Sequence, residues 1–230
     1  MYYDSEVIRY LQANKILALK LDQAFPGVGK AVSNQIEMVG SGAQRMLYYT
    51  SCFTDEYQDI CQKQKTEDMR FRQGIVHLIQ HGNVVFDMLQ IYFEEIFKYR
   101  TTEQLEHIKK ILMAVNIHIA ASSLTNLGFA LAAASLVVVG TNLGLNMSVI
   151  TGRVSGTALS IAGVYGIVQK AADSANRLHY IYPAYYSALY SQELEMMFFL
   201  IEPLFERADA FNAQCASDGE IADIIKKMVQ

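Results

Sequence analysis

The sequence is poor in the residues that mark unusual classes of protein. Its 230 residues include three prolines, fourteen glycines and three cysteines, and 18% are charged against 52% hydrophobic. The scarcity of proline excludes collagen-like and proline-rich low-complexity chains, and the high hydrophobic share excludes intrinsic disorder. A net charge of −4 gives no general attraction to nucleic acid. The length predicts one domain, or at most two small ones.

The cysteines and the amino terminus also lack the patterns of secreted, disulfide-rich proteins. Cys52, Cys61 and Cys215 are odd in number and lack the spacing of metal ligands, so we expect reduced, structural thiols. Asp4 and Glu6 stand where a signal peptide carries basic residues, and no apolar core follows them. We therefore expect synthesis in the cytoplasm without a signal peptide, and either membrane association or secretion by a non-Sec route.

Strand signals are missing as well, and the apolar pattern predicts an all-α fold. The longest amphipathic stretch predicts one helix over residues 67–99. Capping boxes, in which a Ser or Thr stands three residues before a Glu or Gln, begin at Thr101 and Ser217. Pro183 suits the first turn of a helix, and Pro203 is expected to kink or end one.

The most unusual absence is that of charge in the middle of the chain. Residues 1–110 form an amphipathic helical region with 13 basic and 14 acidic residues, and residues 171–230 form an acidic helical region with 4 basic against 9 acidic residues. Between them, residues 111–170 have no acidic residue and only two basic ones, Arg153 and Lys170. We interpret the three regions as one domain: a helical bundle with a central, uncharged helical hairpin flanked by amphipathic helices.

The uncharged region is long enough for two membrane-crossing helices. About 20 mostly apolar residues cross a bilayer core as a helix, and the 42 consecutive residues 111–152 carry no charge. A polar turn between two glycines predicts a hairpin with arms over residues 112–139 and 145–169 and a tip at Thr141 and Asn142.

Small residues recur at intervals of four along both arms. In a glycine zipper this spacing places small side chains on one helix face, which lets two helices pack closely in lipid. Polar residues and Arg153 weaken the apolar character of the arms, which favours conditional insertion over a permanent anchor. The residues expected to make these helix contacts are Gly128, Ala132, Gly140, Gly144, Gly152, Gly156, Gly163 and Gly166.

This arrangement resembles the pore-forming colicins and related membrane-active bacterial effectors. The resemblance rests on the uncharged residues 111–169 between amphipathic helices, and no family signature residue carries over. It implies a toxin-like effector with a water-soluble form that opens at a bilayer, inserts its hairpin and permeabilises the membrane. Its partners would be the lipid bilayer, a cognate immunity or chaperone protein, and further copies of the chain in the membrane. Neutralisation of acidic residues in the tail is expected to ease the approach to an anionic surface: Glu193, Glu195, Glu202 and Glu206.

Two alternatives stay open: a soluble helical interaction or adaptor protein whose uncharged hairpin is core, and a resident two-pass membrane protein. We do not expect an enzyme, because no catalytic signature is present. His77 and His81 lie four apart but lack a third metal ligand, and the segment 27–31 lacks the hydroxyl residue of a phosphate-binding loop. No cofactor, metal or nucleic acid is expected.

A tyrosine-rich stretch follows the second arm directly. Tyr182, Tyr186 and Tyr190 are four residues apart, which is the spacing of a packing stripe on a helix. The same tyrosines would also suit a belt at the headgroup level of a membrane. We prefer the packing interpretation.

Overall fold

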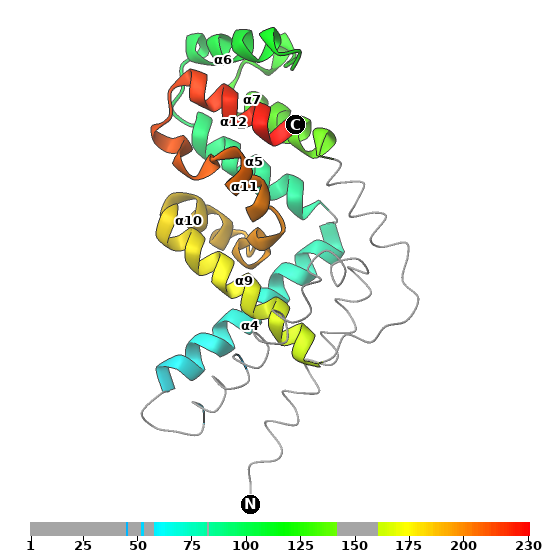
Figure 1. Cartoon of the computed structure of the whole chain (residues 1–230), viewed down its shortest axis with the longest axis vertical. Helices are drawn as coiled ribbons and strands as arrows, with labels where there is room; N and C mark the ends of the chain where they lie inside the picture. Colours follow the sequence, from blue (N-terminus) through cyan, green and yellow to red (C-terminus); the bar gives the residue numbers. More distant parts are fainter. Residues whose placement is uncertain (1–44, 46–51, 53–57, 82, 142–160) are drawn as a thin grey trace, which may run out of the picture. The chain divides into compact units, whose positions relative to one another are not determined.

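The computed structural model describes residues 45, 52, 58–81, 83–141 and 161–230 (Figure 1). Within these ranges the chain is helical and contains no strand, which confirms the predicted all-α class. The elements are α4 (Gln58–His81), α5 (Val84–Phe97), α6 (Thr102–Ala114), η3 (Ala121–Ser123), α7 (Asn126–Gly140), α9 (Ile161–Ile181), α10 (Pro183–Ser191), η4 (Glu195–Leu200), α11 (Glu202–Ala208), η5 (Ala210–Cys215) and α12 (Asp218–Val229).

The chain divides into two compact units. Unit 1 takes residues 1–80 and 146–173, and unit 2 takes residues 81–145 and 174–230. Among the described residues, unit 1 therefore holds most of α4, the first part of α9, Arg45 and Cys52. Unit 2 holds α5, α6, α7, the end of α9 and everything that follows it.

Both predicted capping boxes are present and begin helices of unit 2. The Thr101 hydroxyl accepts a hydrogen bond from the backbone N–H of Gln104, whose side chain accepts from the Thr101 N–H at 3.0 Å. Ser217 and Glu220 form the same pair of bonds at the start of α12. These bonds satisfy backbone N–H groups that have no partner inside the helix, and they fix where α6 and α12 begin.

The predicted single helix over residues 67–99 is wrong, because α4 and α5 replace it. Asn83 precedes α5 with backbone angles of φ −117° and ψ 29°, outside the α-helical range. Asparagine competes for backbone hydrogen bonds and favours helix ends over helix interiors, which accounts for a break here. Pro183 lies in the first turn of α10, as expected. Pro203 does not end or kink a helix, because η4 already ends at Leu200 and Pro203 lies in the first turn of α11. A proline is tolerated in that turn, where its missing N–H has no partner inside the helix.

An aromatic core fills unit 2. The Phe205 ring lies 4.6 Å from that of Tyr92 and is stacked on Tyr185 at 5.6 Å between ring centroids. The two tyrosine hydroxyls are satisfied by backbone carbonyls: Tyr92 donates to Ala210 at 2.9 Å and Tyr185 to Met88 at 2.8 Å. Because buried hydroxyls are costly unless they are bonded, these two contacts fix the register of α5 against the chain around it.

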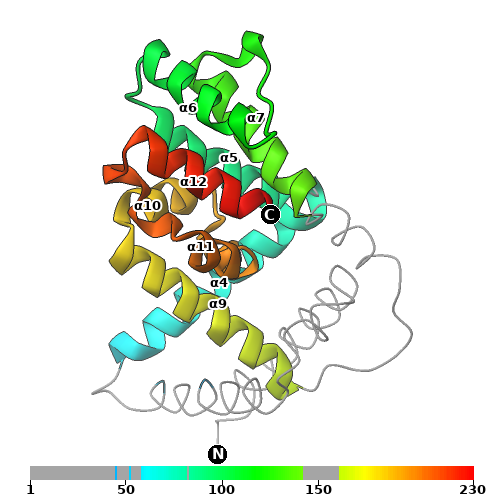
Figure 2. The same cartoon turned by 45° about the horizontal axis from the view of Figure 1, so that its top comes forward.

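In unit 2, α7 packs against both α5 and α12, and α6 lies beyond them at the end of the unit (Figure 2). Helix α5 packs on α7 and α10, while α12 contacts α6, α7 and α11. Phe129 of α7 meets Phe97 of α5 edge to face at 4.9 Å. The apolar face of α12 is buried as the sequence predicts, with Ile221, Ile224, Ile225 and Met228 all inside.

The predicted tyrosine stripe is only partly a packing stripe. Tyr182 is buried, together with Tyr185, which does not belong to the stripe. Tyr186 is half-buried and stacks on the ring of His179 at 4.3 Å, and Tyr190 is exposed. Tyr182 has non-helical backbone angles between α9 and α10, so the three tyrosines do not lie on one continuous helix.

Unit 1 contains a disulfide between Cys52 and Cys61, with Cα atoms 4.9 Å apart. The expectation of reduced thiols is therefore wrong for these two residues and holds for Cys215, which is free and exposed. An odd cysteine count excludes full pairing but does not exclude one bridge, and the Cα separation lies in the range that a disulfide spans. Among the described residues of unit 1, the buried apolar ones lie on α4 and α9: Cys61, Phe71, Ile75, Leu78, Ile167, Val168, Ala171 and Ala172.

The predicted first arm, residues 112–139, is not one helix. Helix α6 ends at Ala114, and Asn116 adopts a left-handed conformation with φ 62°. The Ile117 N–H then donates to the carbonyl of Leu112 at 3.0 Å, which is the pattern of a Schellman helix end. The chain continues through η3 before α7 begins, so the uncharged residues change direction well before the predicted tip.

The second arm is described only from Ile161 onward. There it belongs to α9, which continues past the predicted end at residue 169 to Ile181. The predicted tip residue Asn142 lies outside the described residues, as do Gly144, Gly152 and Gly156. Within the ranges that the structure describes, no helix is both long and apolar enough to cross a bilayer.

Candidate functional site

Helix α7 is apolar on the face it buries and also on the face it exposes. Its fifteen residues carry no charge, and its inner face, led by Phe129 and Val137, is buried in unit 2. On the opposite side, Leu127 is 55% exposed and Val139 is 73% exposed. A helix at the surface of a globular protein normally turns charged and polar residues outward. We define the outer face of α7 as Leu127, Leu131, Ser135, Val138 and Val139.

The spacing of these residues explains why they share a side of the helix. Leu127, Leu131 and Ser135 follow at intervals of four, and Val138 and Val139 continue the same row one turn later. Thr125 caps the helix by accepting the Gly128 N–H at 3.1 Å, which sets the start of the row. The position of the outer face on α7 therefore follows from the spacing of these residues together with the cap.

The residues before α7 extend the uncharged surface. Between Ile111 and Thr141 no described residue is an acid, a lysine or an arginine. Met113 and Val115, at the end of α6, are 45% and 36% exposed. Unit 2 thus presents a continuous stretch of chain with exposed apolar side chains and no charge to hydrate it.

The small residues predicted to pack helices in lipid pack against protein in α7. A β-carbon on Gly128 would lie 2.8 Å from the hydroxyl of its own cap, Thr125. A β-carbon on Gly140 would lie 2.7 Å from the carbonyl oxygen of Val229 on α12. Ala132 is half-buried, and Thr141 is the residue after the helix, donating its hydroxyl to Val137.

The remaining predicted contact residues do not join this group in the described chain. Gly163 and Gly166 belong to α9 in unit 1, and Gly166 is buried there. The structure therefore brings Gly128, Ala132 and Gly140 together on one helix.

A second feature, which sequence reasoning missed, is a buried arginine in unit 1. Arg45 has no exposed surface, and its guanidinium makes five hydrogen bonds. Two go to Asp68 Oδ1, from Nε at 3.1 Å and from Nη2 at 2.5 Å. The others go to Glu67 Oε2 at 3.1 Å, to Gln169 Oε1 at 3.2 Å and to the Gln64 carbonyl at 3.3 Å. A guanidinium has five N–H groups, so the donors of this buried charge are satisfied.

Two carboxyl groups, those of Glu67 and Asp68, bond to the single guanidinium of Arg45. Burial raises the pKa of Asp68 to about 8, because a charged carboxylate is disfavoured away from water. Both bonds from Arg45 reach the same oxygen, Oδ1, so a proton can sit on Oδ2 without displacing them. With Asp68 protonated, the positive charge of Arg45 faces the negative charge of Glu67.

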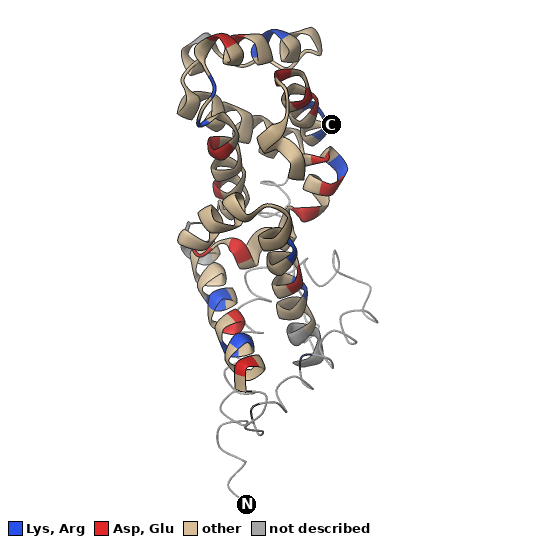
Figure 3. Ribbon diagram, turned by 90° about the vertical axis from the view of Figure 1, so that its left-hand side faces the viewer, with Lys and Arg blue, Asp and Glu red and all other residues tan. Residues whose placement is uncertain are grey.

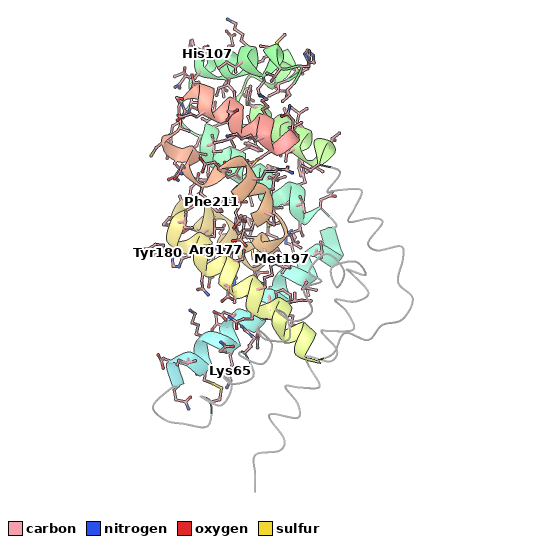
Figure 4. All side chains as sticks on the ribbon, in the orientation of Figure 1. Lys65, His107, Arg177, Tyr180, Met197 and Phe211 are labelled. Atoms are coloured by element: carbon pink, nitrogen blue, oxygen red, sulfur yellow. A yellow bond between two sulfur atoms is a disulfide. The ribbon has the colours of Figure 1, made fainter. Side chains whose placement is uncertain are left out.

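The acidic tail is only partly a surface feature. Glu195 and Glu202 are buried, and Glu206 is exposed. Arg177 of α9, which is labelled in Figure 4, pairs with Glu202 at 2.7 Å and with Glu206 at 3.4 Å. Of the four glutamates whose neutralisation is expected to ease approach to an anionic surface, Glu195 and Glu202 thus lie in the interior of unit 2. The expectation itself stays a prediction.

No metal site appears among the described residues. His77 is half-buried and interacts with neighbouring groups, while the side chain of His81 lies outside the description. The part of the chain that the structure describes contains no group of three side chains able to hold a metal ion. Comparison with known proteins finds no matching family model, no similar curated protein and no similar solved structure.

Proposed function

We propose that this protein is a membrane-active helical protein, a toxin-like effector that docks on a lipid bilayer and permeabilises it. The observation that supports this best is the outer face of α7, which is apolar and exposed on a helix whose inner face is already core. A helix with apolar residues on every side is typical of apolar surroundings, and the core of a bilayer provides such surroundings. The chain around α7 adds no charge that would oppose the contact.

The length of α7 makes docking at the interface the first step. Fifteen residues at 1.5 Å each span about 22 Å, whereas a bilayer core is about 30 Å thick. Helix α7 alone is therefore too short to cross, but it can lie in the interface with Leu127, Leu131 and Val139 among the acyl chains. Each methylene group that leaves water contributes about 0.8 kcal/mol to such binding.

Permeabilisation then requires more of the chain than α7. Phe129 and Val137 anchor the helix in the core of unit 2, and their loss from that core would cost several kilocalories per mole. We therefore place docking before any separation of α7 from α5 and α12. The uncharged residues that follow α7 supply the additional apolar length.

A second candidate is a helical interaction or adaptor protein. It is favoured by the inner face of α7, where Phe129 packs on Phe97 and Gly140 on Val229, so that this part of the uncharged region serves as ordinary core. The outer face would then receive an apolar surface of another protein. The two candidates use the same residues and differ in what covers them.

Flotation with liposomes separates the two candidates. We would compare the wild type with a double variant, Leu127→Glu and Val139→Glu, on vesicles with and without anionic lipid at pH 5 and pH 7.4. The control is Tyr180→Glu, which places an acid on a side chain 90% exposed and outside the uncharged region. Thermal unfolding checks that each variant folds.

We expect the wild type and the control to float and to release trapped dye. The double variant should lose at least tenfold in both, because each glutamate carries a hydrated charge into the contact. A wild type that stays in the aqueous fraction under all four conditions would reject the membrane proposal and leave the interaction candidate. Equal flotation by the double variant would show that α7 is not the docking face.

A further inference from the structure

The Arg45 centre links α4 and α9 within unit 1. Helix α4 supplies Gln64, Glu67 and Asp68, and α9 supplies Gln169. Helix α4 carries acidic and basic residues along much of its length, as the colours of Figure 3 show, whereas residues 161–169 of α9 include none. Arg45 bonds to both helices, and its side chain is charged and fully buried.

The two sides of the bridge are unequal. Toward α4, Arg45 makes four hydrogen bonds, including both carboxylate contacts. Toward α9 it makes one, to the uncharged amide oxygen of Gln169. If α9 moves away, Arg45 keeps its charge partners on α4 and gives up only this amide acceptor. Separation at α9 therefore avoids the cost of a buried, unpaired guanidinium that separation at α4 would incur.

Gln169 is also placed at a boundary in the sequence. It is the last residue of the uncharged run 154–169, and Lys170 and Asp173 follow it. Its own amide group donates to Asp173 at 2.8 Å, which orients its oxygen toward the guanidinium. The neighbouring apolar residues Ile167 and Val168 are buried. The contact thus lies where charge-poor chain meets the charged remainder of α9.

We propose that the bond between Arg45 and Gln169 is a clasp that holds the charge-poor start of α9 on α4 and opens on the α9 side when the protein meets a bilayer. This inference rests on the proposed function, because the start of α9 belongs to the second predicted arm. Opening exposes the buried neighbours of Gln169, Ile167 and Val168, for lipid contact. Arg45 stays bonded to Asp68 and Glu67 of α4 and needs no new counter-charge.

The test uses the full-length chain and a nearly isosteric substitution. Gln169→Met removes the acceptor and keeps the length of the side chain. Gln62→Met is the matched control, because it makes the same change at an exposed position of α4 in the same unit. Dye release is followed from vesicles of three parts phosphatidylcholine to one part phosphatidylglycerol, and amide hydrogen exchange is measured without lipid. Gln169→Leu serves as a second variant if Gln169→Met does not fold.

We expect Gln169→Met to release dye about tenfold faster than the wild type. In the same variant, exchange should rise about tenfold at the amides of residues 167–172 and stay unchanged in α12. The Gln62→Met control should match the wild type in both measurements. Vesicles untouched by the wild type would overturn the proposed function and the clasp with it. Active wild-type protein that Gln169→Met does not accelerate would overturn the clasp alone.

Discussion

Gly140, at the end of α7, lies directly against the backbone of Val229, at the end of α12. A β-carbon at residue 140 would stand 2.7 Å from the Val229 carbonyl oxygen, 2.8 Å from its Cγ1 and 3.2 Å from its Cα. Two of these three atoms belong to the backbone, which cannot turn aside as a flexible side chain can. The two helix ends therefore approach more closely than any larger residue at position 140 permits.

Gly140→Ala should destabilise unit 2 by about 1–3 kcal/mol, the usual cost of overpacking. At an exposed helical position the same change would stabilise by up to about 1 kcal/mol, because alanine restricts the unfolded chain. Gly219→Ala in α12 is the matched control, since a β-carbon there meets nothing within 4 Å. Urea unfolding of both variants checks the prediction. Equal midpoints for the two would show that α12 moves freely away from α7.

Ser217→Ala should destabilise α12 by about 1 kcal/mol, the typical cost of losing an N-cap. The Ser217 hydroxyl accepts from the Glu220 N–H and donates to the Glu220 carboxylate at 2.7 Å. Ser187→Ala is the control, because Ser187 is exposed inside α10 and alanine is at least as good a helix former there. Thermal unfolding at pH 7 measures both, and an unchanged melting temperature in Ser217→Ala would contradict the role of the cap.

The contribution of the same cap to stability depends on pH, and the pKa of Glu220 gives the direction of this dependence. Hydrogen bonds from the Ser217 backbone N–H and then from its hydroxyl lower the pKa of Glu220 below its ordinary value of 4.5. The contribution of the ionised carboxylate is therefore complete above about pH 4.5 and is lost as the pH falls through the lower, folded-state pKa. NMR titration of Glu220 should show the lowered pKa in the wild type and a return toward 4.5 in Ser217→Ala.

Asp68 predicts a pH dependence of the opposite sign. Its pKa is about 8 in the folded state against an ordinary value of 3.8. The folded protein therefore holds this proton more tightly than the unfolded chain, so the contribution of Asp68 is complete below about pH 4 and is lost as the pH rises toward 8.

Asp68→Asn should remove this dependence, because the amide is neutral at every pH and keeps an oxygen for Arg45. We expect the wild type to lose stability relative to the variant between pH 5 and pH 8, measured by hydrogen exchange in α4. Asp59→Asn, an exposed acid on the same helix, is the control. Parallel stability curves for the wild type and Asp68→Asn across this range would contradict the raised pKa.

Local signals in the sequence predicted local structure well. The boxes at Thr101 and Ser217, the helix start at Pro183 and the apolar face of α12 all follow from residue patterns within a few turns of chain. The helix end at Asn116 was missed, although asparagine is a residue that tolerates the left-handed conformation. The long apolar run favoured the prediction of one continuous helix there. The only local signal for the helix end is a single polar residue, Asn116.

Long-range partners were not predictable in the same way. Arg45 lies 124 positions from Gln169, and no spacing rule connects them. The outer face of α7 could have been recognised from the sequence, because Leu127, Leu131 and Val138 stand at helical spacing opposite Phe129 and Val137. The residues of α7 alone do not indicate which of its two faces is buried in unit 2. That choice depends on α5 and α12, which lie elsewhere in the chain.

Reduction of the Cys52–Cys61 disulfide should destabilise unit 1 by about 2–3 kcal/mol. The bridge joins residues nine positions apart, and closing a loop of about ten residues removes this much chain entropy from the unfolded state. Hydrogen exchange in α4 should therefore rise about 30- to 150-fold in the double variant Cys52→Ala and Cys61→Ala, or in the wild type with reductant. Cys215→Ala is the control, since that thiol is exposed and free. Reductant that leaves α4 exchange unchanged in the wild type would show that the bridge does not hold this helix in place.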